Sequence, residues 1–254
     1  MLVASALMGG IAWNLLTWRF GIPSSSSHAL VGGLLGASIT AAGTGSVNVN
    51  GVMTKVVFPL VGSPILGLVI GFALMVIIYN IFRHANPGAL NRRFRRLQLV
   101  SAAYMAFSHG SNDAQKTMGI MTLALVVAGI LPPDSDIPLP IILLAATAIS
   151  FGTMAGGWRI IRTMGQRVVK LDPVRGFAAE TTAATIIFGA SHFGMPVSTT
   201  HVISSAIMGV GSVERLSAVR WGVAGNILVA WVLTIHAAAL VAAVSYAVLH
   251  ALLG

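Results

Sequence analysis

The sequence GIPSSSSHALVGGLLG, residues 21–36, recurs without a gap as GMPVSTTHVISSAIMG at residues 194–209. Five of the sixteen positions are identical, and most of the others exchange serine for threonine or one aliphatic residue for another. Proline and histidine are scarce in this chain, so their joint recurrence at one spacing indicates an internal repeat. Proline, a run of hydroxyl residues and a glycine-rich apolar segment, repeated in two halves, are typical of membrane proteins whose broken helices meet around a substrate.

The composition is that of an integral membrane protein. Apolar residues make up 56% of the chain, charged residues make up only 8%, and the mean hydropathy is +0.88. A spanning helix needs about 20 apolar residues, so we expect an all-α integral membrane protein with about eight hydrophobic segments. Four of these segments are uninterrupted, at residues 1–18, 56–82, 138–157 and 221–249. Four more carry polar interruptions that predict broken or re-entrant helices, at residues 22–42, 97–131, 176–193 and 196–211.

The net charge of +9 is distributed between the apolar segments rather than over one face. Five arginines fill residues 83–96, and five further basic residues fill residues 158–175. Loops of this kind face the cytoplasm, so the charge is explained by membrane orientation and not by a nucleic-acid partner. Residues 132–138 carry two acids and no base, which places them on the outer side. Compact loops and the lack of a targeting segment predict a multi-pass protein of the cell (inner) membrane.

Counting spans from these two loops predicts the topology of the repeat. Residue 21 then lies on the inner side and residue 194 on the outer side, provided that the intervening segments span fully. The two motifs therefore start from opposite faces, as in two inverted-topology repeats. If either motif is re-entrant, this parity changes. We accordingly divide the chain into the first repeat, residues 1–82, a basic cytoplasmic loop, residues 83–96, and the second repeat, residues 97–254.

A polar block interrupts the apolar segment at residues 97–131. It reads SHGSNDAQK, residues 108–116, and polar groups at membrane depth normally face a protein interior or a water-filled cavity. We expect two half-helices, 97–108 and 116–131, joined by an unwound turn whose free carbonyls hold a cation. Asn112 and Asp113 add hard oxygen ligands suited to Na⁺. The alternative is an ordinary loop outside the membrane. The chain has no cysteine, and no metal beyond a transported cation is expected.

The two hydroxyl motifs are predicted to be helix N-termini. Proline is tolerated in the first turn of a helix, and serine or threonine there cap free amide groups. Such a terminus attracts anions through its unpaired amides and the helix dipole. The alternative is that small hydroxyl residues only permit close helix packing. The candidate anion donors are the hydroxyl groups of Ser25, Ser26, Ser27, Ser198, Thr199 and Thr200.

Two histidines and one glutamate complete the candidates derived from the residues. His28 and His201 occupy matched places after the hydroxyl runs, where a structural role that orients the hydroxyls is favoured over direct ligation. Glu180 follows the basic loop at the start of an apolar segment. The helix dipole alone explains a carboxylate near a helix start, whereas a deeper position would make Glu180 a cation or proton site.

These motifs resemble those of the inorganic phosphate transporter (PiT) family. The resemblance rests on SHGSNDAQKTMGI, residues 108–120, on the pair GIPSSSSH and GMPVSTTH, and on ETTAATIIFGASHFGMPVSTTH, residues 180–201. It implies an all-α transporter with no cofactor that moves inorganic phosphate together with Na⁺ or H⁺, and not an enzyme. Carried over by matching positions, it implicates Asn112, Asp113, the hydroxyls of both motifs, and nearby Gln115 and Lys116. Together with the candidates derived above, the predicted cation site comprises Asn112, Asp113 and Glu180. The predicted phosphate site comprises Gln115 and the hydroxyls of both motifs, with His28, His109, Lys116 and His201 in supporting positions.

The chain departs from the family pattern in its first half. The family carries a first-half counterpart of the Asn-Asp block, commonly Gly-Ala-Asn-Asp, and this sequence has none. In the second half the Asn-Asp block begins near Gly110, far upstream of the hydroxyl motif that begins at Gly194. In the first half the hydroxyl motif begins at Gly21, too close to the first residue for such a block to precede the motif at that distance. The first repeat is therefore expected to be incomplete, most simply because the sequence starts at an internal methionine of a longer member.

Electrostatics connect the two sites. A buried Asp113 would repel phosphate unless a cation or proton lay between them, which makes symport with alternating access the expected mechanism. The expected partners are phosphate, the coupling cation and the lipid bilayer, with a possible homodimer. Sulfate is the rival substrate, although its full ionisation leaves it no proton to offer Asp113 or Gln115. Two rivals belong to another class: a membrane-embedded enzyme that uses His109, Asp113 and a serine, and a non-transporting membrane fragment. Against the enzyme, the sequence has no G-x-S-x-G or H-E-x-x-H motif.

Overall fold

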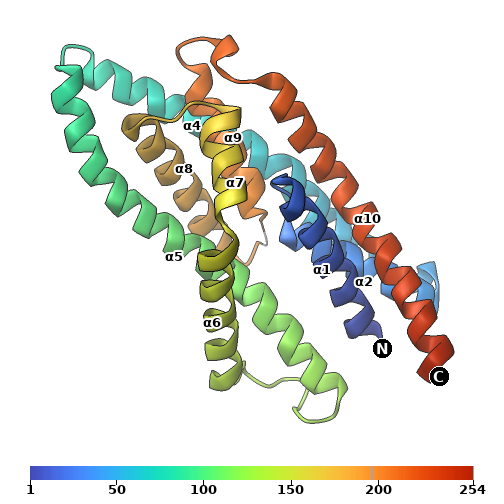
Figure 1. Cartoon of the computed structure of the whole chain (residues 1–254). Helices are drawn as coiled ribbons and strands as arrows, with labels where there is room; N and C mark the ends of the chain where they lie inside the picture. The colour runs from blue at the N-terminus through green and yellow to red at the C-terminus, as the bar shows by residue number, and fades with distance from the viewer. Residues whose placement is uncertain (196, 254) are drawn as a thin grey trace.

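The computed structural model describes residues 1–195 and 197–253, so Pro196 of the second motif lies outside the described residues. All regular structure in this part of the chain is helical, which confirms the all-α prediction (Figure 1). The long helices are α1 (Leu2–Phe20), α2 (Ser26–Ala42), α4 (Phe58–Phe82), α5 (Pro87–Val127), α6 (Leu139–Gly156), α8 (Pro173–His192), α9 (Thr199–Ser212) and α10 (Trp221–Leu253). The short ones are η1 (Thr44–Ser46), α3 (Val49–Val52), η2 (Met53–Val57), α7 (Trp158–Arg162), η3 (Thr163–Val168) and η4 (Leu216–Ala218).

Three helical stretches within the described residues are long and apolar enough to cross a membrane. They are Val49–Phe82, Leu139–Gly156 and Trp221–Leu253, and they match three of the four uninterrupted segments of the sequence. Their most apolar windows are only 22%, 11% and 33% buried, so most of these apolar side chains face outward. An outward apolar face is what lipid contact requires, since lipid gives no reason to bury it.

Two helical hairpins carry the repeated motif. Gly21 ends α1 and Gly194 follows α8, both with left-handed backbone (φ 67° and 64°), and α2 and α9 begin at residues 26 and 199. The glycines, the helix starts and the preceding caps thus keep the register in which the two motifs align in the sequence. A residue without Cβ adopts this backbone at little cost, which explains why glycine recurs at the bend of each hairpin.

The second hairpin, α8 and α9, returns to the side from which it starts. Arg175, in the first turn of α8, forms an ion pair with Glu214, just beyond α9, and Tyr79 of α4 also donates to Glu214. Both ends of the α8–α9 hairpin therefore lie on one side. The chain turns back at the tip between α8 and α9, and the prediction that residue 194 lies on the outer side of the membrane stays a prediction.

The tips of the two hairpins meet inside the molecule. The rings of His28 and His201, in the first turns of α2 and α9, lie 4.8 Å apart between centroids. In Figure 1 α8 lies in the upper part of the molecule, whereas α1 and α2 lie lower, towards the N-terminus. The first turns of α2 and α9 thus meet in the interior of the molecule, whereas Gly194, at the start of the second motif, is exposed.

Each hairpin is held by a long helix from elsewhere in the chain. Helix α2 packs along α10, and α9 packs along α4. A Cβ added at Gly36 would overlap the carbonyl oxygen of Ala239, and one added at Gly209 would overlap that of Leu68. Close backbone approach therefore explains the last identity of the repeated motif, in the manner of small residues at membrane helix interfaces.

Helix α5 is continuous through the polar block. It runs for 41 residues, or about 60 Å, without the unwound turn that the sequence predicts at residues 108–116. The half-helix prediction is wrong because Asn112, Asp113 and Lys116 find partners on the hairpin tips. Their charges and amides are satisfied without breaking the backbone ladder.

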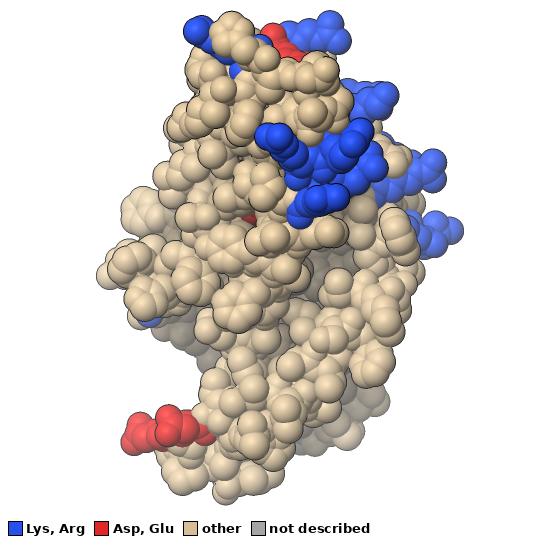
Figure 2. Space-filling view, turned by 90° about the vertical axis from the view of Figure 1, so that its left-hand side faces the viewer, with Lys and Arg blue, Asp and Glu red and all other residues tan. Residues whose placement is uncertain are grey.

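Basic residues gather at one end of the molecule, and the exposed acidic residues of the α5–α6 connection lie at the other (Figure 2). The predicted loops are largely helical: residues 87–96 form the start of α5, and residues 158–168 form α7 and η3. Arg159 and Thr163 hydrogen-bond the carbonyls of Arg19 and Gly21, at 2.9 and 2.8 Å. The second basic segment thus holds the end of α1.

Candidate functional site

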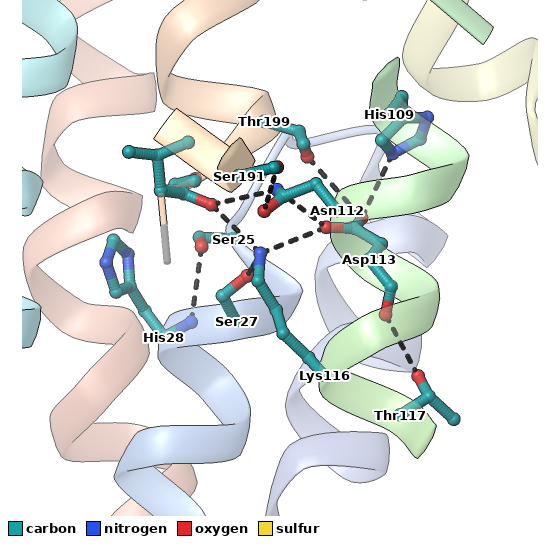
Figure 3. Close-up of polar contacts among 12 residues, drawn as sticks. Ser25, Ser27, His28, His109, Asn112, Asp113, Lys116, Thr117, Ser191 and Thr199 are labelled. Carbon is teal, nitrogen blue, oxygen red and sulfur yellow. Dashed lines mark hydrogen bonds and ion pairs between the residues drawn. The ribbon is translucent and has the colours of Figure 1, made fainter. Parts of the chain in front are cut away.

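One face of α5 points at both hairpin tips (Figure 3). His109, Asn112, Asp113 and Lys116 follow one another at intervals of three, one and three residues, so the helical period places them on adjacent rows of one face. The tip of the α1–α2 hairpin contributes Ser25 to Ser27, and that of the α8–α9 hairpin contributes residues 197–199. Five separate helices therefore position this cluster.

Lys116 joins α5 to both tips. Its Nζ donates to Ser27 Oγ at 2.6 Å, to the carbonyl oxygen of Val197 at 2.9 Å and to Asp113 Oδ1 at 3.1 Å. An ammonium group has three donors, so all of them are engaged. The side chain is only 17% exposed. The sequence placed Lys116 near the site but gave no sign of its contact with Val197, because that contact spans 81 residues.

Asp113 accepts from both sides of its carboxylate. Lys116 occupies Oδ1, and His109 Nε2 lies 3.0 Å from Oδ2. Thr199 Oγ1 of the second tip lies 3.5 Å from Oδ2, at the long limit of a hydrogen bond. The Asp113 side chain is 15% exposed, whereas that of His109 is 39% exposed. Asp113 is thus reached by donors from α5 and from α9.

Asn112 is the most buried of the four α5 residues of the cluster, at 2% exposed. Its Nδ2 donates to the carbonyl of Val197 at 3.2 Å, and its Oδ1 accepts from Ser191 Oγ at 3.3 Å. Both side-chain groups therefore brace the second tip against α5. Ser191 was not among the sequence candidates, since a single serine near the end of an apolar segment carries no motif or periodicity.

Two serines cap the helices of the tips. Ser25 Oγ accepts the amide of His28 at 3.2 Å, and Ser198 Oγ accepts that of His201 at 3.3 Å. Both serines are buried, at 1% and 2% exposed. A cap uses one lone pair and leaves the hydroxyl hydrogen free to donate. The amides preceding the capped one in each helix have no partner within the helix, so each tip offers N–H donors as well.

A cavity of about 290 Å³ opens beside the first tip. Its polar lining comes from Ser26, Ser27, Asp113, Lys116 and Thr117, and its apolar lining comes from α2 and α6. Ser26 is exposed and Ser27 half-buried. Thr199 is buried, and Thr200 is partly buried on the first turn of α9, outside the lining of this cavity. The cavity therefore offers hydroxyls, an ammonium and a carboxylate to one small ligand.

Two predicted ligands lie outside this cluster. Gln115 is exposed, because two residues from Asp113 correspond to about 200° around a helix. Glu180 of α8 accepts from Ser101 Oγ at 2.6 Å and lies 3.5 Å from Gln98 Nε2. Ser101 is twelve residues, or about 18 Å, from Asp113 along α5. The structure thus separates Gln115 and Glu180 from the residues with which they were grouped.

The two histidines of the motif lie behind the caps, away from α5. The ring of His201 contacts that of His28 and stacks on Trp231 of α10 at 3.7 Å between centroids. Trp231 Nε1 in turn donates to the carbonyl of Pro23 at 3.1 Å. These contacts join the backs of both tips to α10. Trp231 was not foreseen, since an aromatic residue in an apolar helix carries no signal of its own.

Comparison with known proteins identifies what this arrangement belongs to. The model of the phosphate transporter family (PHO4) matches residues 1–92 and 82–242. A probable low-affinity inorganic phosphate transporter of Bacillus subtilis (strain 168) is 46% identical over 98% of this chain and 75% of its own length. Its counterpart in Rhizobium meliloti (strain 1021) is 49% identical over 96% of this chain and 73% of its own.

A solved structure agrees with these relatives. The sodium-dependent phosphate transporter matches with a TM-score of 0.89 and 27% sequence identity, over 99% of this chain and 80% of that one. The relatives are named as transporters, and the prediction that this chain is not an enzyme is confirmed. The chain belongs to the phosphate transporter family.

Proposed function

We propose that this chain transports inorganic phosphate across a membrane by symport with a cation, Na⁺ or H⁺. The observation that carries the proposal is the convergence of two hydroxyl-capped helix N-termini, α2 and α9, on the Asp113–Lys116 face of α5. Helix N-termini are ready anion sites because their first amides and dipoles point at the ligand. The names of the relatives support phosphate as that anion.

Phosphate is proposed to bind between the tips and α5, beside the first tip. Ser26 and Ser27 line the cavity there, and Thr199 faces Asp113 from the other tip. The hydroxyls and the free amides donate to phosphate oxygens, and Lys116 supplies a positive charge. Asp113 accepts a hydrogen bond from a P–OH group, which monobasic phosphate carries and sulfate lacks. This acceptor favours phosphate over sulfate as the substrate.

Asp113 also provides the coupling. The Asp113 side chain is only 15% exposed and shares a cavity with the oxyanion. The two negative charges repel each other, so the free energy of the complex rises unless positive charge accompanies the anion. We therefore assign the coupling cation to the neighbourhood of Asp113 and Asn112. Glu180, bound to Ser101, is a separate candidate at the α5–α8 contact.

Alternating access is proposed to use the repeat. The matched hairpins and their exchanged packing on α10 and α4 support two inverted-topology repeats with about eight membrane segments. Rocking of one repeat, residues 1–82, against the other, residues 97–254, would open the site alternately to each side. The collection of basic residues at one end supports a cytoplasmic location for that end, in a cell inner membrane.

Uptake of labelled phosphate into proteoliposomes that contain the purified protein tests the proposal. Wild-type protein should accumulate phosphate in response to a cation gradient, and sulfate in excess should compete weakly. Asp113→Asn should abolish cation-dependent uptake, whereas Asp134→Asn, in the exposed acidic connection, should leave it unchanged. Persistent cation-dependent uptake by the Asp113 variant would show that the coupling site lies elsewhere, and equal competition by sulfate would refute the substrate assignment.

A further inference from the structure

We propose that the ammonium group of Lys116 is the resident cation of this site, so that phosphate binding by this chain requires no Na⁺. The inference rests on the proposed function and concerns the same cluster. It leaves H⁺ as the coupling ion, because the charge that Na⁺ would bring to the site is covalently part of α5.

The first argument is the chemistry of the groups around Lys116 Nζ. Its three contacts are a carboxylate oxygen, a hydroxyl oxygen and a backbone carbonyl oxygen, at 3.1, 2.6 and 2.9 Å. The carbonyl belongs to Val197, in the non-helical segment that precedes α9. Unwound carbonyls beside broken helices are the groups that hold Na⁺ in transporters of this architecture. Lys116 therefore occupies a position built from the oxygens that an alkali cation would use.

The second argument is that protein donors already point at the oxygens that a metal cation would need there. Asn112 Nδ2 also points at the Val197 carbonyl, at 3.2 Å, and Asn112 Oδ1 already accepts from Ser191. His109 Nε2 lies against the second oxygen of Asp113, at 3.0 Å. A metal ion placed among these groups would face N–H donors from two sides. The predicted ligands Asn112 and Asp113 are thus directed at protein donors.

The third argument is charge balance in the cavity. Asp113 and Lys116 both line the 290 Å³ cavity beside Ser26 and Ser27, and they form a direct ion pair. An approaching oxyanion therefore meets a carboxylate whose charge is already compensated. The electrostatic condition that would otherwise demand Na⁺ beside Asp113 is met within α5, which leaves H⁺ as the coupling ion of the proposed symport. The solved relative is named as sodium-dependent, so this chain is proposed to differ from it in this respect.

Equilibrium binding of labelled inorganic phosphate to the purified full chain tests the inference. The assay compares NaCl with choline chloride at equal ionic strength. The Kd of the wild-type protein for phosphate should be the same in both salts within about twofold. Lys116→Met should weaken binding in choline by about tenfold or more, and NaCl should restore part of the loss, because the vacated oxygens become available to Na⁺. Lys170→Met removes an exposed lysine at the basic end and should change neither value.

The outcomes separate the inference from the proposed function. If wild-type protein binds phosphate only in NaCl, the inference is overturned and phosphate transport stands. If it binds phosphate in neither salt, the proposed function fails and the inference fails with it. Full affinity of Lys116→Met in choline would also overturn the inference. Should the methionine variant not fold, Lys116→Arg keeps the positive charge and should still bind phosphate in choline.

Discussion

Replacement of Trp231 tests whether the backs of the hairpin tips set the geometry of the site. Trp231 is 5% exposed, stacks on His201 and donates its indole N–H to the carbonyl of Pro23. Trp231→Phe keeps an aromatic ring over His201 and removes the donor. Pro23 is fully buried, so its carbonyl oxygen would lose this partner without gaining water.

The expected loss of stability follows from that unpaired carbonyl. A buried acceptor without its donor costs about 1–3 kcal/mol, and each kcal/mol lowers the melting temperature of a chain of this size by about 2–4 °C. Trp231→Phe should therefore lower it by about 2–12 °C. Trp231→Ala adds a cavity and should cost about 3–5 kcal/mol. Trp158→Phe is the matched control, because Trp158 is 77% exposed and its replacement should stay within about 0.5 kcal/mol.

Phosphate affinity is the second readout. Pro23 stands two residues before the cap Ser25, and the same tip carries Ser27, which contacts Lys116. If binding must reorder a tip loosened by about 1 kcal/mol or more, the Kd for phosphate rises by at least about fivefold. Thermal unfolding in detergent and equilibrium phosphate binding measure the two effects on one preparation. If Trp231→Phe is as stable as Trp158→Phe and binds phosphate equally well, the role assigned to Trp231 is refuted. If Trp231→Phe loses stability but keeps its affinity for phosphate, the proposed link between Trp231 and the binding site is refuted.

Two further predictions concern the helix at the site and the base of the second hairpin. Gly110→Ala should raise the free energy of unfolding by about 0.5–1 kcal/mol, because Gly110 lies inside continuous α5 with open space for a Cβ. Gly36→Ala should lower the free energy of unfolding, because its Cβ would overlap a neighbouring backbone. A Gly110 variant that is destabilised in thermal unfolding would argue for a broken helix. The hydrogen bond from Tyr79, aided by the nearby guanidinium of Arg175, lowers the pKa of Glu214 below its ordinary 4.5. The contribution of this carboxylate to stability is therefore present above pH 4.5 and is lost as the pH falls through the lower pKa of the folded state. Its size is about 1 kcal/mol or less in this exposed setting, and Glu214→Gln should abolish that acid-side change in melting temperature.

Local chemistry made the hairpin tips predictable. The proline and the hydroxyl run indicate a helix start, and the structure begins α2 and α9 within that run, capped by Ser25 and Ser198. The cap bond joins residues three apart, so it is encoded entirely within the motif. The glycine that ends each preceding segment is also local, since it supplies the left-handed bend. The repetition of these short-range signals gave the paired tips their common register.

Contacts across long sequence separations were beyond the same reasoning. The polar block of α5 was expected to unwind, because Asn112 and Asp113 had no visible partner in an apolar segment. Their partners are Val197, Ser191 and Lys116, and the first two belong to the distant α8–α9 hairpin. A helix keeps its backbone bonds when its polar side chains are satisfied from outside, so no break was needed.

Span counting at α8 has a related limit, because it does not separate a spanning helix from a re-entrant hairpin. Hydropathy measures whether a segment tolerates the membrane interior, and a re-entrant hairpin passes that test as well as a spanning helix does. What distinguishes them is the position of the hairpin tip, which here lies against α5 and the tip of the first hairpin. The ion pair of Arg175 with Glu214 shows only that α9 returns beside the start of α8. Both are charged residues flanking apolar segments, and the orientation rule treats them as loop charges. Their pairing appears only when α8 and α9 are folded against each other.

The matched tips are used unequally, and this asymmetry follows from their contact with a single helix. Ser27 and Thr200 are equivalent in the repeat, as are Ser26 and Thr199. Lys116 engages Ser27 of the first tip, whereas Asp113 lies against Thr199 of the second. Helix α5 thus presents its positive group to one hairpin and its negative group to the other. An anion that enters beside Ser27 draws on Lys116, which also holds the Val197 carbonyl of the opposite tip. Because that ammonium has only three donors, any bond it gives to phosphate must weaken one of its three existing bonds, so binding at one tip is felt at the other or at Asp113.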